Sequence, residues 1–175
     1  ATAAILLRQQ SQRVVALKPI CSGGRDDARL LQAAAGKVVP LDEVNPWHFR
    51  AALAPVLAAR KEKKRVRLRA VVSHIGRVAK KFEVVIVEGA GGLLSPLGED
   101  FDSRDLIRAL NATPIIVCPN KLGAVNQVRL VLAALPRTIA RRARVVLVNP
   151  SKPDAASRTN LELLKEFLNG DHLRV

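Results

Sequence analysis

The sequence predicts an α/β protein with a doubly wound, mostly parallel sheet and helices on both faces, a Rossmann-like arrangement of three layers. Apolar, β-branched runs such as residues 84–87 are continuous rather than alternating, which is typical of parallel strands buried on both faces. Helical patterns separate these runs along the chain. The chain has 175 residues, of which 49% are hydrophobic, so it fits one domain over residues 1–175 and disorder is excluded.

The elements follow in chain order from hydrophobic spacing and from Gly, Pro and Asn breaks. Asp26 or Asp27 is expected to cap the second helix, and Gly36 to end it. A loop is expected over residues 18–24, and an extended, turning stretch between residues 38 and 47. The expected strands are residues 13–17, 82–87, 114–118 and 145–148. The expected helices are residues 2–10, 27–35, 51–60, 69–81, 103–110, 124–135 and 155–168.

The chain is strongly basic, with 29 Lys and Arg residues against 15 Asp and Glu residues, which gives a net charge of +14. The excess gathers in two clusters, residues 60–69 and residues 137–144. Such clusters indicate either a surface for nucleic acid or another anion, or solvated positions at loops and helix ends. We favour solvated surface and do not expect nucleic acid as a partner, because no aromatic residues interleave with the cations. A basic nucleic-acid-binding module stays as an alternative function.

Other residue types exclude several classes of protein. No apolar run reaches the ~18 residues that a membrane span needs, so no membrane association is expected. Cys21 and Cys118 are predicted to be reduced thiols of a cytoplasmic protein. His48, His74 and His172 lack the spacing of metal ligands, and none is given a catalytic role.

Polar and Gly-rich residues follow the predicted strands, where ligands bind in open α/β sheets. Lys18 follows the first strand, residues 88–92 (Glu-Gly-Ala-Gly-Gly) follow the second, and Asn149 follows the last. Glycines let backbone N–H groups approach an anion, a glutamate can hold Mg²⁺, and a lysine can neutralise phosphate charge. The alternatives are a tight turn, a solvated lysine and, for Asp27, a helix cap. Together the residues favour a phosphate or nucleotide site.

Five motifs in order then carry a resemblance to a known family. They are Lys-Pro-x-x-Ser-Gly at 18–23, Asp-Ala-x-x-Leu at 27–31, Asn-Pro-Trp-x-Phe at 45–49, Val-Glu-Gly-Ala-Gly-Gly at 87–92 and Lys-Leu-Gly-x-x-Asn at 121–126. Over nearly the whole chain this series resembles the dethiobiotin synthetases. The resemblance implies a fold like that of the P-loop NTPases and a cytoplasmic homodimer. It also implies a ligase of biotin biosynthesis that joins CO₂ to 7,8-diaminopelargonic acid using ATP and Mg²⁺, through a carbamate and a carbamic–phosphoric anhydride.

The resemblance also implies roles for individual residues. Lys18 would be catalytic, and Ser22 would contact the substrate. Asp27 and Glu88 would hold Mg²⁺ beside the ATP phosphates. The remaining expected ATP contacts are Gly89, Ala90, Gly91, Asn149 and Pro150, the last two near the adenine. The expected contacts to the substrate carboxylate, at a helix start across the dimer interface, are Leu122, Gly123 and Asn126.

One family feature is absent from the sequence. No G-x-x-x-x-G-K-T phosphate-binding loop occurs, and the resemblance places that loop immediately before Ala1. It places a further adenine-binding segment after Val175, so the domain is expected to be incomplete at both ends. Either the natural protein has these segments outside this chain, which we favour, or it lacks them. The second case predicts a non-catalytic or regulatory homologue without a P-loop, and the residues that precede Ala1 discriminate the two.

Overall fold

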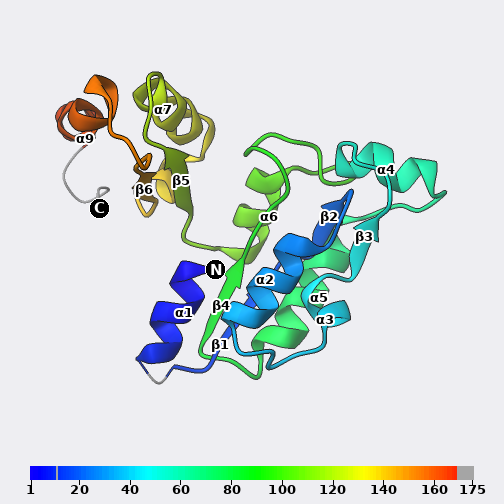
Figure 1. The fold of residues 1–175 in the computed structure, drawn as a ribbon. Coiled ribbons are helices and arrows are strands. Elements are labelled where there is room, and N and C mark those ends of the chain that lie inside the picture. Colours follow the sequence, from blue (N-terminus) through cyan, green and yellow to red (C-terminus); the bar gives the residue numbers. More distant parts are fainter. Residues whose placement is uncertain (11, 169–175) are drawn as a thin grey trace. The chain divides into compact units, whose positions relative to one another are not determined.

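The computed structural model describes residues 1–10 and 12–168, and Figure 1 shows the ribbon. His172 lies outside the described residues. The chain divides into two compact units, Ala1–Leu106 and Ile107–Val175. In the described residues the strands pair as three two-stranded parallel ladders, β1–β4, β2–β3 and β5–β6, with helices packed against them. The predicted α/β class is confirmed, and a single domain over residues 1–175 stays a prediction.

The central ladder of the first unit joins β1 (Val14–Leu17) to β4 (Val84–Val87). Helices α1 (Thr2–Gln9) and α2 (Asp26–Ala34) pack against β1, as Figure 1 shows in blue. Alanines at the contact allow the helix backbones to approach the strand closely, which suits a strand with every residue buried. The core cluster consists of Ala4, Val14, Ala16, Leu31, Ala34 and Ala35.

A second ladder in the first unit was not predicted. Residues expected to form a loop contain β2 (Ile20–Ser22), which pairs with β3 (Trp47–Phe49). The loop prediction is wrong there because Ile20, Cys21 and Phe49 are buried, and burial outweighs the Gly and Pro signals nearby. The short helix α3 (Leu41–Val44) lies between these strands in the sequence.

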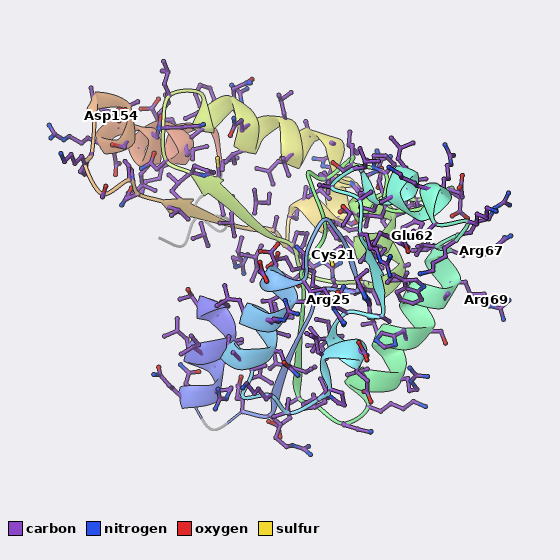
Figure 2. All side chains as sticks on the ribbon, turned by 45° about the vertical axis from the view of Figure 1, so that its right-hand side comes forward. Cys21, Arg25, Glu62, Arg67, Arg69 and Asp154 are labelled. Atoms are coloured by element: carbon purple, nitrogen blue, oxygen red, sulfur yellow. The ribbon has the colours of Figure 1, made fainter. Side chains whose placement is uncertain are left out.

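Two further helices lie in the first unit, and a third begins there and crosses its boundary at Leu106. Helix α4 (Pro55–Lys61) begins four residues later than predicted, because Pro55 takes the first helical position. Helix α5 (Leu68–Ala79) buries one face at helical spacing, and α6 (Ser103–Leu110) forms as predicted. Figure 2 shows the side chains of Arg67 and Arg69 projecting away from the ribbon at the start of α5.

The second unit is built on the ladder of β5 (Ile115–Pro119) and β6 (Arg144–Val148). Helices α7 (Ala124–Ala134) and α9 (Ala155–Phe167) pack against this ladder, and α8 (Arg137–Ala140) is a single turn of helix. The shared core consists of Cys118, Ala124, Val128, Val145, Leu147 and Leu164. No helix within residues 1–10 and 12–168 is both long enough and apolar enough to cross a membrane.

Candidate functional site

Lys18 brings three of the sequence motifs together in the first unit. Its Nζ donates to Glu88 Oε1 at 2.6 Å and to the Gly89 carbonyl at 3.1 Å, and it lies 3.3 Å from Asp27 Oδ2. The register explains the meeting of residues 70 positions apart, because Leu17 and Val87 are paired at the ends of parallel strands. The residue Lys18 is only 6% exposed, so a buried positive charge lies at the carboxyl ends of β1 and β4.

Asp27 reaches Lys18 from the first turn of α2. The helix begins at Asp26 with Arg25 at the N-cap position and no side-chain cap, so the expectation that Asp26 or Asp27 caps it is wrong. Gly36 does follow the helix with a φ of 81°, as predicted. Asp26 pairs with Arg29 at 3.0 Å, which leaves Asp27 as the acidic residue that turns to Lys18.

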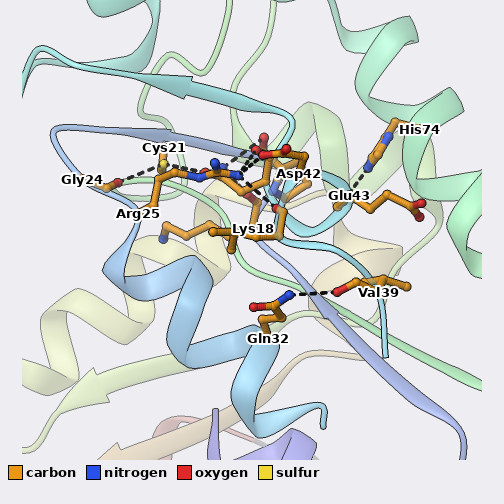
Figure 3. Close-up of polar contacts among 12 residues, drawn as sticks. Lys18, Cys21, Gly24, Arg25, Gln32, Val39, Asp42, Glu43 and His74 are labelled. Atoms are coloured by element: carbon orange, nitrogen blue, oxygen red, sulfur yellow. Dashed lines mark hydrogen bonds and ion pairs between the residues drawn. The ribbon is translucent and has the colours of Figure 1, made fainter. Parts of the chain in front are cut away.

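Asn45 fixes the backbone around Lys18, and the sequence did not single it out as a site residue. Its Nδ2 donates to the Lys18 carbonyl at 2.7 Å, while its Oδ1 accepts from Cys21 Sγ and Arg25 Nε, both at 3.1 Å. Figure 3 shows two of these partners, Cys21 and Arg25, beside Lys18. A fully buried amide with every bond made holds its partners rigidly. The Asn-Pro pair of the motif at 45–49 was the available signal.

The Cys21 thiol is structural in this arrangement. Burial raises the pKa of Cys21 above its ordinary value, so the neutral thiol is favoured. The single thiol proton is shared between the Gly24 carbonyl and Asn45 Oδ1, each 3.1 Å from Sγ. A protonated, buried thiol with both contacts inside the protein is not an activated nucleophile.

The glycine turn after β4 is a narrow cradle. Gly91 has a φ of 75°, and a Cβ there would lie 2.6 Å from Ser95 Oγ. A Cβ at Gly89 would lie 2.8 Å from the Ser103 hydroxyl. Glycine is therefore required at Gly91, whereas a side chain at Gly89 would have to displace the Ser103 hydroxyl; Ala90 lies between them. Among the described residues, Ser103 Oγ is the single buried side-chain nitrogen or oxygen without a hydrogen-bond partner, so an unused donor stands beside the turn.

Ser22 lies at the end of β2 in the same unit. Its hydroxyl donates to the Leu53 carbonyl at 2.6 Å, and the side chain stays partly exposed. The hydroxyl oxygen keeps its capacity to accept a hydrogen bond. The structure therefore places Ser22 where an external donor can still reach it.

The other predicted substrate contacts lie in the second unit. Gly123 takes a φ of 90° at the N-cap of α7, and no side chain caps that end. Leu122 before it is 84% exposed, and Asn126 is exposed on the first turn. The positive end of the helix dipole is thus open to solvent beside an exposed apolar side chain.

Asn149 belongs to a network of amides in the second unit that the sequence did not predict. Asn120 is 3% exposed, and its Nδ2 donates to Asn149 Oδ1 at 2.6 Å and to the Ser157 carbonyl at 2.7 Å. Asn160 donates in turn to Asn120 Oδ1 at 2.8 Å. Asn149 and Pro150 are exposed after β6, so a buried network positions one exposed amide.

The carboxylates beside Lys18 suit Mg²⁺ by their chemistry. Asp27 and Glu88 offer the hard oxygen atoms that this ion prefers, and both side chains are exposed. No group of three or more His, Cys, Asp or Glu residues that could hold a metal ion occurs in the part of the chain that the structure describes. A site with two carboxylates fits an ion that takes its other ligands from water and substrate phosphates.

The chain is similar to known proteins over most of its length. Residues 1–173 match the sequence model of a family described as AAA domain. The ATP-dependent dethiobiotin synthetase BioD of Bacillus subtilis (strain 168) is 34% identical over 170 residues, covering 94% of this chain and 74% of that protein. The BioD proteins of Akkermansia muciniphila and Anaeromyxobacter dehalogenans (strain 2CP-C) are 33% and 39% identical. Those alignments cover 92% and 82% of this chain, and 76% and 66% of the two relatives.

Proposed function

Because the chain belongs to the ATP-dependent dethiobiotin synthetase family, we propose that it closes the ureido ring of 7,8-diaminopelargonic acid with CO₂ and ATP, giving dethiobiotin for biotin biosynthesis. The observation that carries the proposal is the meeting of Lys18 with Asp27, Glu88 and the glycine turn. Phosphoryl transfer needs a positive charge, carboxylates that can hold a metal ion, and backbone N–H groups close to the phosphates. The buried ammonium, the two carboxylates and the glycine turn after β4 supply these. ATP is the co-substrate in this proposal.

The proposed reaction has three steps, with a role for Lys18 in two of them. One amine of the substrate adds CO₂ to give a carbamate and releases a proton. A carbamate oxygen attacks the γ-phosphorus, forming a carbamic–phosphoric anhydride and ADP. The second amine attacks the anhydride carbonyl, closes the ring and expels phosphate. The Lys18 ammonium stabilises negative charge on the carbamate and on the transferring phosphoryl group, because its buried position strengthens the attraction.

The remaining site residues hold and orient the reactants in this proposal. Asp27 and Glu88 hold Mg²⁺, which when bound neutralises phosphate charge. Gly89, Ala90 and Gly91 lie against the ATP phosphates, where the narrow turn admits a close approach of the backbone. Ser22 lies near the reacting end of the substrate.

The resemblance to the family assigns two further sets of ligand contacts. Asn149 and Pro150 lie near the adenine, with the Asn149 amide oriented by Asn120. Leu122, Gly123 and Asn126 bind the substrate carboxylate of a partner subunit in a homodimer, because the open end of α7 attracts anions.

A product assay tests the function directly. The chain is incubated with 7,8-diaminopelargonic acid, bicarbonate, ATP and Mg²⁺, and dethiobiotin is measured by mass spectrometry. Lys18→Met should lower turnover roughly a hundredfold to a thousandfold, the usual effect of removing one electrostatic stabiliser. Lys80→Met, which removes an exposed lysine at the end of α5, is the matched control and should leave turnover unchanged.

The outcomes separate the proposal from its alternative. Turnover that Lys18→Met does not lower would contradict the assigned role of Lys18. Calorimetric titration with MgATP and with substrate is the second readout. Binding of both ligands by the chain without any dethiobiotin would replace the proposal with a regulatory, non-catalytic homologue.

A further inference from the structure

Seven cations gather in ten residues of the first unit at the end of α4 and the start of α5. We call this set the 60–69 cluster. One carboxylate, Glu62, interrupts it. The described structure gives ion pairs to only two of its cations, Arg60 with Glu99 at 2.6 Å and Lys64 with Glu62 at 2.9 Å. The cluster consists of Arg60, Lys61, Lys63, Lys64, Arg65, Arg67 and Arg69.

The backbone of this cluster is held in a defined shape. Lys64 N–H donates to the Ala59 carbonyl at 2.9 Å, and Lys63, the residue after the C-cap of α4, has a φ of 54°, where glycine is the common choice. Val66 is 1% exposed, and a Cβ at Gly98 would lie 2.5 Å from its carbonyl oxygen. The segment is therefore packed tightly against the turn that carries Glu99.

A cavity of about 460 Å³ opens between these two segments. Its lining residues are Arg60, Lys63, Lys64, Arg65 and Glu99. Two carboxylates offset the four cations, Glu99 in the lining and Glu62 as the ion-pair partner of Lys64, which leaves an excess of two positive charges. The space is far larger than the ~30 Å³ that one water occupies in the liquid. Its size and charge suit an anion of several linked phosphate groups.

The Arg60 guanidinium is already fixed for such a role. It donates to both oxygens of Glu99, Nε at 3.0 Å and Nη2 at 2.6 Å. Arg65 also faces Glu99, and the charges of Arg60 and Arg65 help to lower the pKa of that carboxyl. Within the described residues Lys63 has no carboxylate partner, so its charge is available to a ligand.

We propose that this cavity binds a compact anion with two or more linked phosphate groups, such as a polyphosphate or the phosphate chain of a nucleotide. A concave wall with converging cations matches a small, highly charged ligand. Single-stranded nucleic acid fits less well, because stacking needs exposed rings and the nearby Phe49 is buried beneath Lys64. The proposal goes beyond the proposed function and does not depend on it.

Calorimetric titration of the full chain with sodium tripolyphosphate at about 50 mM salt tests the proposal, since higher salt would screen the attraction. The double substitution Lys63→Gln with Arg65→Gln should weaken binding at least roughly tenfold, the equivalent of one lost charge-assisted hydrogen bond. Arg137→Gln with Arg141→Gln removes the same charge from exposed positions of the other basic cluster. That control should weaken binding less than about twofold.

Further arms identify the site and the ligand class. Lys63→Gly suits the observed φ of 54°, so it should keep the fold while weakening binding, and circular dichroism checks the fold. Lys18→Met should leave tripolyphosphate binding at the cavity intact. Equal weakening by both double substitutions would overturn the proposal in favour of diffuse attraction. Loss of tripolyphosphate binding in Lys18→Met alone would also overturn the proposal. So would duplex DNA that binds more tightly than tripolyphosphate and is weakened equally by the Lys63 and Arg65 substitutions.

Discussion

Replacing Asn120 by leucine is expected to loosen the second unit while keeping a side chain of similar size. The change removes three hydrogen bonds of 2.6–2.8 Å, with partners in Asn149, Ser157 and Asn160. Asn149 is exposed, so water can replace its lost donor. Ser157 and Asn160 are buried, and each loses a partner there. Two buried bonds at about 1–2 kcal/mol each give a loss of about 2–4 kcal/mol.

Native-state hydrogen exchange is the suitable assay. The single tryptophan, Trp47, lies in the first unit, so its fluorescence does not report directly on the second. The backbone amides of β5 and β6 do report on the second unit. Those amides that exchange only on unfolding should exchange roughly thirtyfold to a thousandfold faster in Asn120→Leu than in the unmodified chain. Asn126→Ala is the control, because Asn126 is exposed on α7 and alanine favours a helix.

The result can contradict the reasoning in two ways. Exchange accelerated less than about threefold would mean that the buried amides find other partners or water, contrary to the cost assigned to unpaired groups. Equal acceleration in Asn126→Ala would mean that any change near α7 loosens the unit. Either result would remove the stabilising role given to Asn120.

Four further predictions concern other parts of the chain. Gly98→Ala should lower the free energy of unfolding by about 1–3 kcal/mol, because a Cβ would overlap the opposing backbone; an unchanged urea midpoint would contradict this. Asp154→Ala should speed amide exchange in the first turn of α9 by removing the capping box, with the last turn unaffected. Arg60 holds the pKa of Glu99 below its ordinary 4.5, so this pair's stabilisation is present above that pH and is lost as pH falls; Arg60→Gln should remove that part of the acid dependence of the urea midpoint. The raised pKa of Cys21 should keep its alkylation by iodoacetamide at about pH 8 at least tenfold slower than that of free cysteine.

The sequence predicted the strands of the two larger ladders to within two residues at each end. Continuous β-branched runs such as residues 84–87 leave little choice of structure once they are buried. The β2–β3 ladder was missed because three-residue strands have no periodicity to read, and their pairing depends on contacts between distant segments. Helix α4 was predicted too long because Ala51 to Ala54 have good helix propensity but precede Pro55.

Much of the candidate site could also be predicted from the residues that follow the predicted strands. Lys18 and Glu88 follow paired strands, so parallel register alone brings them together. Asp27 was given the wrong local role, because an acidic residue at a helix start is equally suited to capping or to facing a nearby cation. Asn45 and Asn120 were missed as organising residues, because only tertiary structure shows which amides are buried.

The enclosure of Lys18 has a consequence for whatever anion binds beside it. A lysine side chain in water samples many rotamers, and fixing one costs up to about 2 kcal/mol of conformational entropy. At Lys18 three contacts from two separate segments, the turn after β4 and the first turn of α2, hold the ammonium of a residue that is only 6% exposed. The conformational entropy of the Lys18 side chain is therefore lost when the protein folds and not when an anion binds. A ligand meets an ammonium that is already in place, so its affinity is not reduced by the cost of ordering that side chain.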